Sequence, residues 1–279
     1  MRCIPKRLNE VRQFKTFMAS VRVLRAVQKE RSSKSYAKGY YKEEKAMGPL
    51  FRFESKALDE FIKKPGRLFD AMMGPGRQVV QYAKKGFQVV GNDYNPHMVS
   101  LARKACQKER VHAEFHNKDV SSLRGIPSNK FDYVICTGNS LGCVPGSAKR
   151  RKALQEFSRI LKPGGIFALH IYNRFACAFI PDERGWLFST YFSRDQDLEI
   201  GDWIYHHGKE LGATYNHMFS LSEAKGLITQ SGLVVFAVRF IRRDANGYCK
   251  GPFKSLRAES LLLIGKKQTV NTPLPPHRT

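Results

Sequence analysis

Two glycines and two acidic residues follow the first two apolar runs in the central part of the sequence. Gly74 and Gly76 come soon after the run that ends at Asp70, and Asp93 lies 17 residues beyond Gly76. Glycines at such a turn let the backbone approach a ligand closely, and an acid at this spacing is typical of a carboxylate that binds ribose. The pattern predicts the first half of a nucleoside-binding α/β domain and chemistry that involves an adenosine-containing cofactor.

The charge at this turn separates two kinds of cofactor. A dinucleotide site needs a third glycine, which Val79 replaces here, and Pro75 removes one backbone N–H that could bind a pyrophosphate. Asp70 would also repel a pyrophosphate. S-adenosylmethionine carries no phosphate, and its ammonium group can donate a hydrogen bond to a carboxylate. Asp70 therefore favours S-adenosylmethionine.

These residues resemble the motifs of the class I S-adenosylmethionine-dependent methyltransferases, and the resemblance covers about residues 61–265. The glycine motif of the family falls on Asp70, Gly74 and Gly76, while Met72 replaces the first glycine of the motif. The resemblance implies S-adenosylmethionine as the cofactor. The residues that it assigns to the cofactor are Asp70, Gly74, Gly76, Asp93, Tyr94, Met98, Asp119, Val120, Thr137 and Asn139.

The resemblance also implies a role for several of these residues. Asp93 would bind the ribose, and Tyr94 and Met98 would contact the ribose and the adenine. The Asp119 carboxylate would accept a hydrogen bond from the exocyclic amine of the adenine, and the Val120 N–H would meet a ring nitrogen. The strand motif that ends in Thr137 and Asn139 would complete the pocket.

The sequence specifies the acceptor-binding residues less tightly than the cofactor-binding ones. Methyl transfer from a sulfonium requires the acceptor atom to be aligned with the methyl carbon and water to be excluded, and it needs no fixed set of catalytic residues. We predict Tyr172, Asn173 and His217 as catalytic residues, since two of them end the fifth strand and His217 could reach back over the site. His170 lies inside an apolar strand and is interpreted as a core histidine. The spacing of the histidines supports no metal site. The remaining polar candidates are Ser140, Tyr205, His206, His207 and Tyr215.

Alternating strand and helix patterns must position these residues. They predict an α/β fold with a Rossmann-like, doubly wound and mostly parallel sheet of about seven strands, the last one antiparallel. Ligands of such sheets bind at the carboxyl ends of the strands. The strands are expected at residues 67–71, 87–92, 112–117, 131–136, 166–172, 234–240 and 260–264, and helices at 77–85, 96–108, 147–161 and 222–231.

Appendages surround this domain. A basic amphipathic helix over residues 8–28 and a linker over 32–39 are expected in an N-terminal extension, and an aromatic hairpin is expected as an inserted cap. Tyr36, Tyr40 and Tyr41 could form a lid over a sulfonium by cation–π attraction. The predicted organisation is an extension over 1–38, a methyltransferase domain over 39–265 with the cap at 186–217, and a disordered tail over 266–279.

The amino-acid composition limits which binding partners and which cellular compartment can be expected. The chain carries 48 Lys and Arg against 24 Asp and Glu, a net charge of +24, which attracts polyanions without specifying a site. Its six cysteines include no Cys-x-x-Cys pair, which indicates reduced, intracellular usage. No apolar run approaches the length of a membrane span. A cytoplasmic location is expected, with a mitochondrial one as the alternative because the leader is rich in arginine.

These observations give three hypotheses of function. The first is methyl transfer to a nitrogen or oxygen atom of a small molecule, because the aromatic insertion resembles the substrate cap of small-molecule methyltransferases. The second is methyl transfer to RNA or protein recruited by the basic surface; nucleobase amine chemistry is disfavoured because Thr137 is followed by Gly-Asn-Ser. The third is a non-catalytic nucleoside-binding protein, in which Met72 marks a decayed pocket. Oligomeric state is not predicted.

Overall fold

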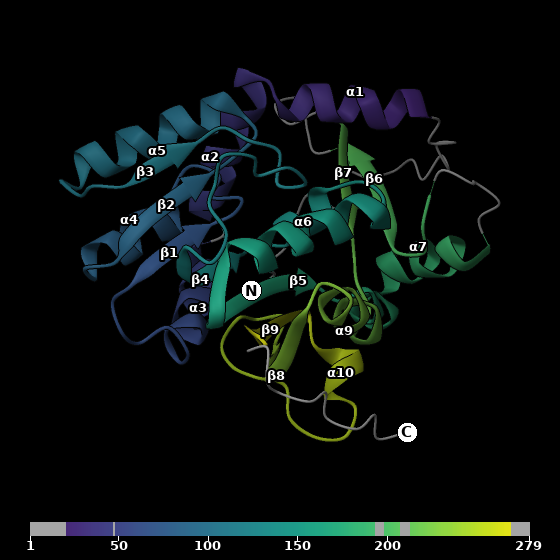
Figure 1. Ribbon diagram of the computed structural model, residues 1–279. Helices are drawn as coiled ribbons and strands as arrows, with labels where there is room; N and C mark the ends of the chain where they lie inside the picture. Colours follow the sequence, from purple (N-terminus) through teal and green to yellow (C-terminus); the bar gives the residue numbers. More distant parts are fainter. Residues whose placement is uncertain (1–20, 47, 193–197, 207–212, 269–279) are drawn as a thin grey trace.

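A seven-stranded sheet forms the centre of the computed structural model, which describes residues 21–46, 48–192, 198–206 and 213–268 (Figure 1). The strand order is β3-β2-β1-β4-β5-β9-β8. β1 to β5 run parallel, and β9 is antiparallel to both of its neighbours. The strands are β1(Arg67–Asp70), β2(Gln88–Asn92), β3(Glu114–His116), β4(Phe131–Cys136), β5(Leu161–Tyr172), β8(Leu233–Ile241) and β9(Ser260–Lys267). The predicted doubly wound sheet with an antiparallel last strand is confirmed.

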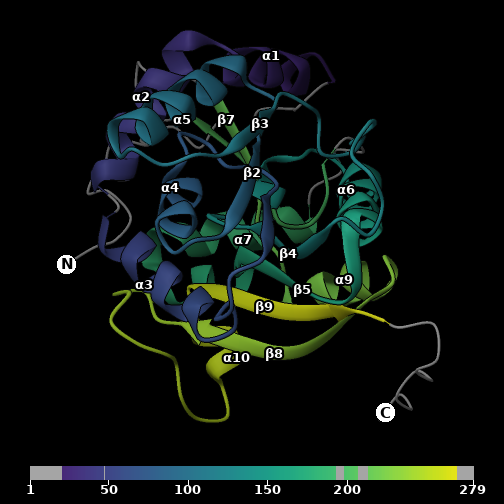
Figure 2. The ribbon, with the colours of Figure 1, turned by 60° about the vertical axis from the view of Figure 1, so that its left-hand side comes forward.

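Helices cover both faces of the sheet, as Figure 2 shows, with α3, α4 and α5 on one side and α6 and α9 on the other. The capping of α5 is local, because the Asn95 side chain accepts a hydrogen bond from the His97 N–H at 2.8 Å and Pro96 occupies the first turn. Ser220 and Glu223 form a capping box at α9. These helices are α3(Gly48–Asp59), α4(Arg77–Lys84), α5(Pro96–Lys108), α6(Ser147–Ile160) and α9(Leu221–Thr229).

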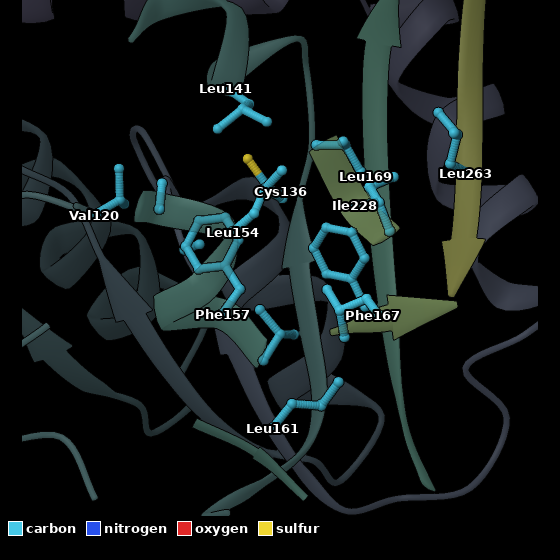
Figure 3. Packing of buried hydrophobic residues seen from close by; sticks show 14 of the residues in the cluster. Val120, Cys136, Leu141, Leu154, Phe157, Leu161, Phe167, Leu169, Ile228 and Leu263 are labelled. Carbon is cyan, nitrogen blue, oxygen red and sulfur yellow. The ribbon is translucent and has the colours of Figure 1, made fainter. Parts of the chain in front are cut away.

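The two faces of β5 carry different residues because successive side chains of a strand point to opposite sides. Phe167 and Leu169 pack against Leu154 and Phe157 of α6 in the apolar cluster that Figure 3 shows. Ala168 belongs to the cluster on the opposite face, and His170 points to that same face. Position 170 is therefore on the side of the sheet that α3 and α4 cover.

The N-terminal extension is more helical than the sequence indicated. α1(Val21–Arg31), α2(Lys34–Ala46) and α3(Gly48–Asp59) follow one another, so residues 34–39 of the expected linker belong to a helix. Residues 8–20 of the expected amphipathic helix lie outside the described residues. α1 lies over β7 at the top of the molecule in Figure 1.

The insertion after β5 also differs from the expected hairpin at 186–217. It begins with the 3₁₀ helix η3(Arg174–Phe179) and with α7(Pro181–Phe192), and only β6(Asp202–His206) and β7(Ala213–His217) form a hairpin. Phe188, Tyr191 and Phe192 are spaced by three and four residues, which is helical spacing rather than strand alternation.

The carboxyl end of the chain also extends further than expected. β9 continues to Lys267, so the predicted tail from residue 266 begins inside a strand, and residues 269–279 of that tail lie outside the described part. A short helix, α10(Lys254–Arg257), precedes β9. Within the described ranges, no helix has the length and apolarity that crossing a membrane requires.

Candidate functional site

Two buried carboxylates lie at the carboxyl ends of β1 and β2. Asp70 is 1% exposed, and its Oδ1 atom has no hydrogen-bond partner among the described residues. Burial raises the pKa of Asp70 to about 8, and Asp93 and Glu54 raise it further while Arg77 opposes them. An unpartnered buried oxygen of this kind is costly unless a ligand supplies a donor.

Asp93 closes the glycine turn from the next strand. Its two carboxylate oxygens accept hydrogen bonds from the Gly74 N–H at 3.0 Å and from the Asn95 N–H at 2.9 Å. Burial raises the pKa of Asp93 to about 6, against these hydrogen bonds and the charge of Arg31. The predicted pair of acids is therefore brought to one edge of the sheet, on either side of the turn.

The two predicted glycines have different surroundings. Gly74 has a φ of +55°, and a Cβ atom there would lie 3.7 Å from the Tyr40 ring of α2. Gly76 has a φ of +93°, and a Cβ atom there would lie 2.8 Å from the Cβ of Ala102 in α5. Gly74 therefore faces the N-terminal helices, and Gly76 allows α5 to approach the turn.

Gly76→Ala is expected to destabilise the protein more than Gly86→Ala. Gly86 has a similar φ of +81°, but no atom lies within 4 Å of its Cβ position. Both variants carry the cost of a left-handed alanine, whereas only Gly76→Ala overpacks a helix contact, which costs about 1–3 kcal/mol. Urea unfolding of the two variants measures this difference. Equal losses of unfolding free energy would show that α5 can shift away from the new methyl group without destabilising the protein.

The N-terminal helices cover this edge. The Asn95 amide donates to the Arg31 carbonyl at 2.6 Å and to the Ser33 carbonyl at 3.3 Å. Tyr36 and Tyr40 of α2 stack with ring centroids 6.1 Å apart, and Tyr41 is 39% exposed. Of the three tyrosines predicted as a lid, the structure places Tyr40 against the glycine turn.

Of the four residues assigned to the adenine side, two are exposed and two are buried. Tyr94 is exposed, and Met98 is buried on α5. Asp119 is exposed, and its Oδ1 accepts hydrogen bonds from the backbone N–H and the hydroxyl of Ser121, both at 2.8 Å. Val120 is buried in the core beside it. One carboxylate oxygen of Asp119 thus stabilises the turn that contains Ser121.

The loop after β4 connects the site to the inserted hairpin. Asn139 is fully buried with a φ of +56°; its amide oxygen accepts from the Tyr172 N–H at 3.0 Å, and its nitrogen donates to the His217 carbonyl at 3.3 Å. Thr137 accepts from Ser140 through its carbonyl oxygen. Asn139 therefore joins β4, β5 and β7 through its side chain.

Of the predicted catalytic residues, Tyr172 and Asn173 lie together at the end of β5 and make different contacts. Tyr172 is half-buried, with its ring 6.0 Å from that of His170. The Asn173 amide donates to the carbonyls of Ser255 and Ala258, at 2.9 and 2.8 Å. Asn173 thus fixes the chain before β9, whereas Tyr172 packs against the buried cluster of the inserted segment that includes Trp186 and Met218.

The predicted reach of His217 over the site is replaced by a buried ion network. The Nδ1 atom of His217 lies 2.6 Å from Asp202 Oδ1, and Nε2 lies 2.7 Å from Glu223 Oε1. Tyr215 donates to the same Asp202 oxygen at 2.6 Å. Both ring nitrogens are thus occupied. Two arginines complete the network, Arg150 with Glu199 and Arg174 with Glu223.

The charges of this network argue against a metal. Ligand atoms of Glu199, His217 and Glu223 lie within 4.8 Å of one another. Glu199 and Glu223 are paired with the guanidinium groups of Arg150 and Arg174, and the two ring nitrogens of His217 contact Asp202 and Glu223. A divalent cation would have to displace these partners, so we interpret the cluster as an ion network that fastens the hairpin to α6 and α9.

Two other candidates on the hairpin, Tyr205 and His206, have described backbones in β6, while His207 lies outside the described residues.

A second buried cluster was not indicated by the sequence. Glu54 of α3 accepts from the Arg77 guanidinium at 2.6 Å and from the Gly138 N–H at 2.7 Å, and its Oε1 lies 2.5 Å from His170 Nδ1. Although burial opposes its ionisation, His170 and Arg77 lower the pKa of Glu54 to about 2. α3 is therefore tied to the residue after the glycine turn, to the β4 loop and to β5.

Comparisons with known proteins identify relatives in sequence and in structure. Residues 68–165 match the family model described as a methyltransferase domain. A protein of Aspergillus luteorubrus, named as a probable methyltransferase, is 31% identical over 157 residues, which are 50% of this chain and 54% of that protein. The chain spans about half the length of the curated relatives it matches.

Solved structures share the fold at lower identity. An S-adenosylmethionine-dependent methyltransferase from Methanosarcina mazei has a TM-score of 0.62 at 20% identity, over 76% of this chain and 97% of that one. The 1,6-didemethyltoxoflavin-N1-methyltransferase of Burkholderia thailandensis, solved with its substrate and S-adenosylhomocysteine, has a TM-score of 0.57 at 18% identity, over 90% and 92%. These comparisons confirm a methyltransferase domain over residues 68–165, and the solved structures confirm its fold.

Proposed function

We propose that this chain, whose residues 68–165 match a methyltransferase domain, is an S-adenosylmethionine-dependent enzyme that methylates a nitrogen or oxygen atom of a small molecule. The observation that carries the proposal is the buried Oδ1 of Asp70, which has no donor among the described residues and lies at the glycine turn. The ammonium group of the cofactor is a donor that matches this oxygen in charge.

The surrounding residues fit the same cofactor. Asp93 lies at the end of the neighbouring strand, where a carboxylate can accept from ribose hydroxyls. Gly74 lies close to the Tyr40 ring, and Met98 and Tyr94 follow on the side assigned to the adenine. Asp70, Asp93 and Glu54 act on one another electrostatically, so a phosphorylated nucleotide would meet repulsion there.

When bound, the cofactor supplies a methyl group that is already activated for displacement. The chain then has to orient the acceptor and exclude water. Tyr40 of α2 covers the glycine turn, the Phe51 ring of α3 lies 3.9 Å from the Cβ position of Gly138, and α1 covers the hairpin. These elements enclose the end of the sheet, where Tyr172 and the β4 loop would contact the acceptor.

This enclosure favours a small acceptor over a polymer, because a base or side chain on a large molecule would need an open approach. The Burkholderia thailandensis enzyme, which has the same fold, holds 1,6-didemethyltoxoflavin in its solved structure. The alternative, an RNA or protein acceptor, is supported by the net charge of +24, which would attract a polyanion.

A methyl-labelling experiment separates the two. The full chain is incubated with S-[methyl-³H]adenosylmethionine and a cell extract fractionated by size into metabolite, RNA and protein pools. The proposal requires label in the metabolite pool. Label confined to RNA or protein would support the polymer acceptor, and no transfer into any pool, with the cofactor bound, would favour a non-catalytic binder.

A further inference from the structure

The Glu54–His170 pair has the geometry of a carboxylate that holds a histidine for proton transfer. His170 Nδ1 lies 2.5 Å from Glu54 Oε1, and both side chains are fully buried. Both ring nitrogens of His170 are buried without a hydrogen bond in the described part of the chain, so Nδ1 meets Glu54 as a close ion contact and Nε2 has no partner. We propose that His170, oriented by Glu54, takes the proton from the methyl acceptor. The inference rests on the proposed function and specifies an acceptor whose N–H or O–H proton must leave.

The proposed step starts from an imidazole whose Nε2 carries a free lone pair. Glu54 is also paired with the Arg77 guanidinium at 2.6 Å, so its carboxylate lies between Arg77 and His170. When the imidazole proton is on Nδ1, the nitrogen nearest to the carboxylate, Nε2 is an acceptor. Glu54 would then stabilise the imidazolium that forms when Nε2 takes up a proton, as the carboxylate does in hydrolase triads.

The position of His170 places it beyond the cofactor carboxylate and toward the acceptor side. Asp70 is level with Ile135 in β4, and Ile135 is level with Ala168 in β5. His170 lies two residues further toward the carboxyl end of β5, on the same face of the sheet as Ala168. Its carbonyl accepts from the Asn139 N–H at 3.1 Å, and its ring is adjacent to Tyr172.

The step balances without another reactant. The acceptor lone pair forms the new bond to the methyl carbon, and the sulfur–carbon bond breaks with its electron pair remaining on sulfur. The proton of the acceptor N–H or O–H passes to His170 Nε2, and it leaves to solvent when the site opens. His170 would therefore be a catalytic residue, and Glu54 a positioning residue that acts through it.

Nitrogen NMR of the histidine-labelled full chain tests the tautomer directly. Spectra are recorded between pH 6 and 9, with and without S-adenosylhomocysteine, and the His170 signal is assigned by its loss in His170→Gln. The expected result is a proton on Nδ1 and a bare Nε2 that becomes protonated as the pH falls. A proton on Nε2 throughout that range would overturn the proposal, whether or not the nucleoside binds.

Activity measurements separate catalysis from support of the fold. With the labelled metabolite pool as acceptor, His170→Gln is expected to lower turnover about 100-fold or more, while its dissociation constant for S-adenosylhomocysteine stays within about twofold of wild type. His112→Gln, at an exposed position, is the matched control and should change neither. Loss of nucleoside binding together with turnover would assign His170 a structural role and overturn the proposal.

Glu54→Gln provides a second variant that keeps a hydrogen-bonding group but removes the charge. Because a nearby carboxylate stabilises an imidazolium, its removal should shift the acid limb of the pH profile of kcat to lower pH. Turnover at neutral pH should fall less than in His170→Gln. A profile that keeps its wild-type acid limb would mean that Glu54 does not act on the proton acceptor, and would overturn the assignment of the pair.

Discussion

Asp70→Asn is expected to weaken binding of S-adenosylmethionine about 10- to 100-fold while stabilising the unliganded protein at pH 8. A hydrogen bond to a charged group contributes about 1.5–3 kcal/mol, and asparagine removes the charge while keeping the shape. The unpartnered Asp70 carboxyl makes burial of the negative charge costly in the free protein. The same change should therefore raise the free energy of unfolding of the unliganded protein and weaken its binding of the cofactor.

The pH dependence of stability distinguishes this account from a general packing effect. The pKa of Asp70 is raised by burial from 3.8 to about 8. An acid with a raised pKa favours the folded state below its ordinary pKa, and that contribution is lost as the pH rises toward 8. Wild type should lose thermal stability over this window, and Asp70→Asn should lose less. Calorimetric titration at pH 8 measures the affinity of each protein for S-adenosylmethionine. An unchanged affinity in Asp70→Asn would show that Asp70 does not bind the ammonium group.

Asp202→Ala is expected to lower the free energy of unfolding by about 3–5 kcal/mol. The side chain is 3% exposed, and its Oδ1 accepts from both Tyr215 and His217. Removing one member of a buried ion network leaves the others desolvated without a partner. Glu109→Ala, which breaks the exposed pair with Lys84, is the control and should lower the stability far less.

Denaturant unfolding of both variants measures these losses of stability. A loss for Asp202→Ala no greater than that for Glu109→Ala would contradict the network.

Lowering the pH should also destabilise the protein through this network. Although burial opposes their ionisation, His217 lowers the pKa of Asp202 and of Glu223. Carboxyl groups with lowered pKa stabilise the fold above their ordinary pKa, and this contribution is lost as the pH falls. Asp202→Ala should therefore reduce the acid sensitivity of stability.

The cofactor side of the site could be predicted from sequence because its determinants are local. Asp70 and Asp93 each end an apolar run, and parallel strands bring such ends to one edge of the sheet. Gly74 and Gly76 have positive φ values, as turn glycines in this position require. No long-range contact had to be known for the turn and the two acids to be placed together.

The second cluster could not be predicted because its partners come from distant elements. Glu54 lies on a helix before the first strand, where an acid in an amphipathic pattern is usually solvated. Only packing brings it to Arg77, Gly138 and His170. The interpretation of His170 as a core histidine was consistent with its burial, but the sequence contains no signal for its carboxylate partner.

The environment of His217 was missed for a different reason. Asp202 and His217 are directly paired across the hairpin, so a sequence prediction with the correct strand register would have placed them together. The expected hairpin began at residue 186, where the chain forms α7, and this obscured the register. The aromatic residues of that segment have helical spacing, and they belong to α7 rather than to a strand.

Calorimetric titration of the full-length wild-type chain with S-adenosylmethionine tests the central claim most directly, with NAD and ATP titrated in parallel. The account predicts saturable, one-to-one binding of S-adenosylmethionine and of S-adenosylhomocysteine, which share the ammonium group. It predicts no measurable binding of the two phosphorylated nucleotides, because Asp70 and Asp93 repel them. Saturable binding of NAD or ATP, or no binding of S-adenosylmethionine by the folded chain, would contradict it.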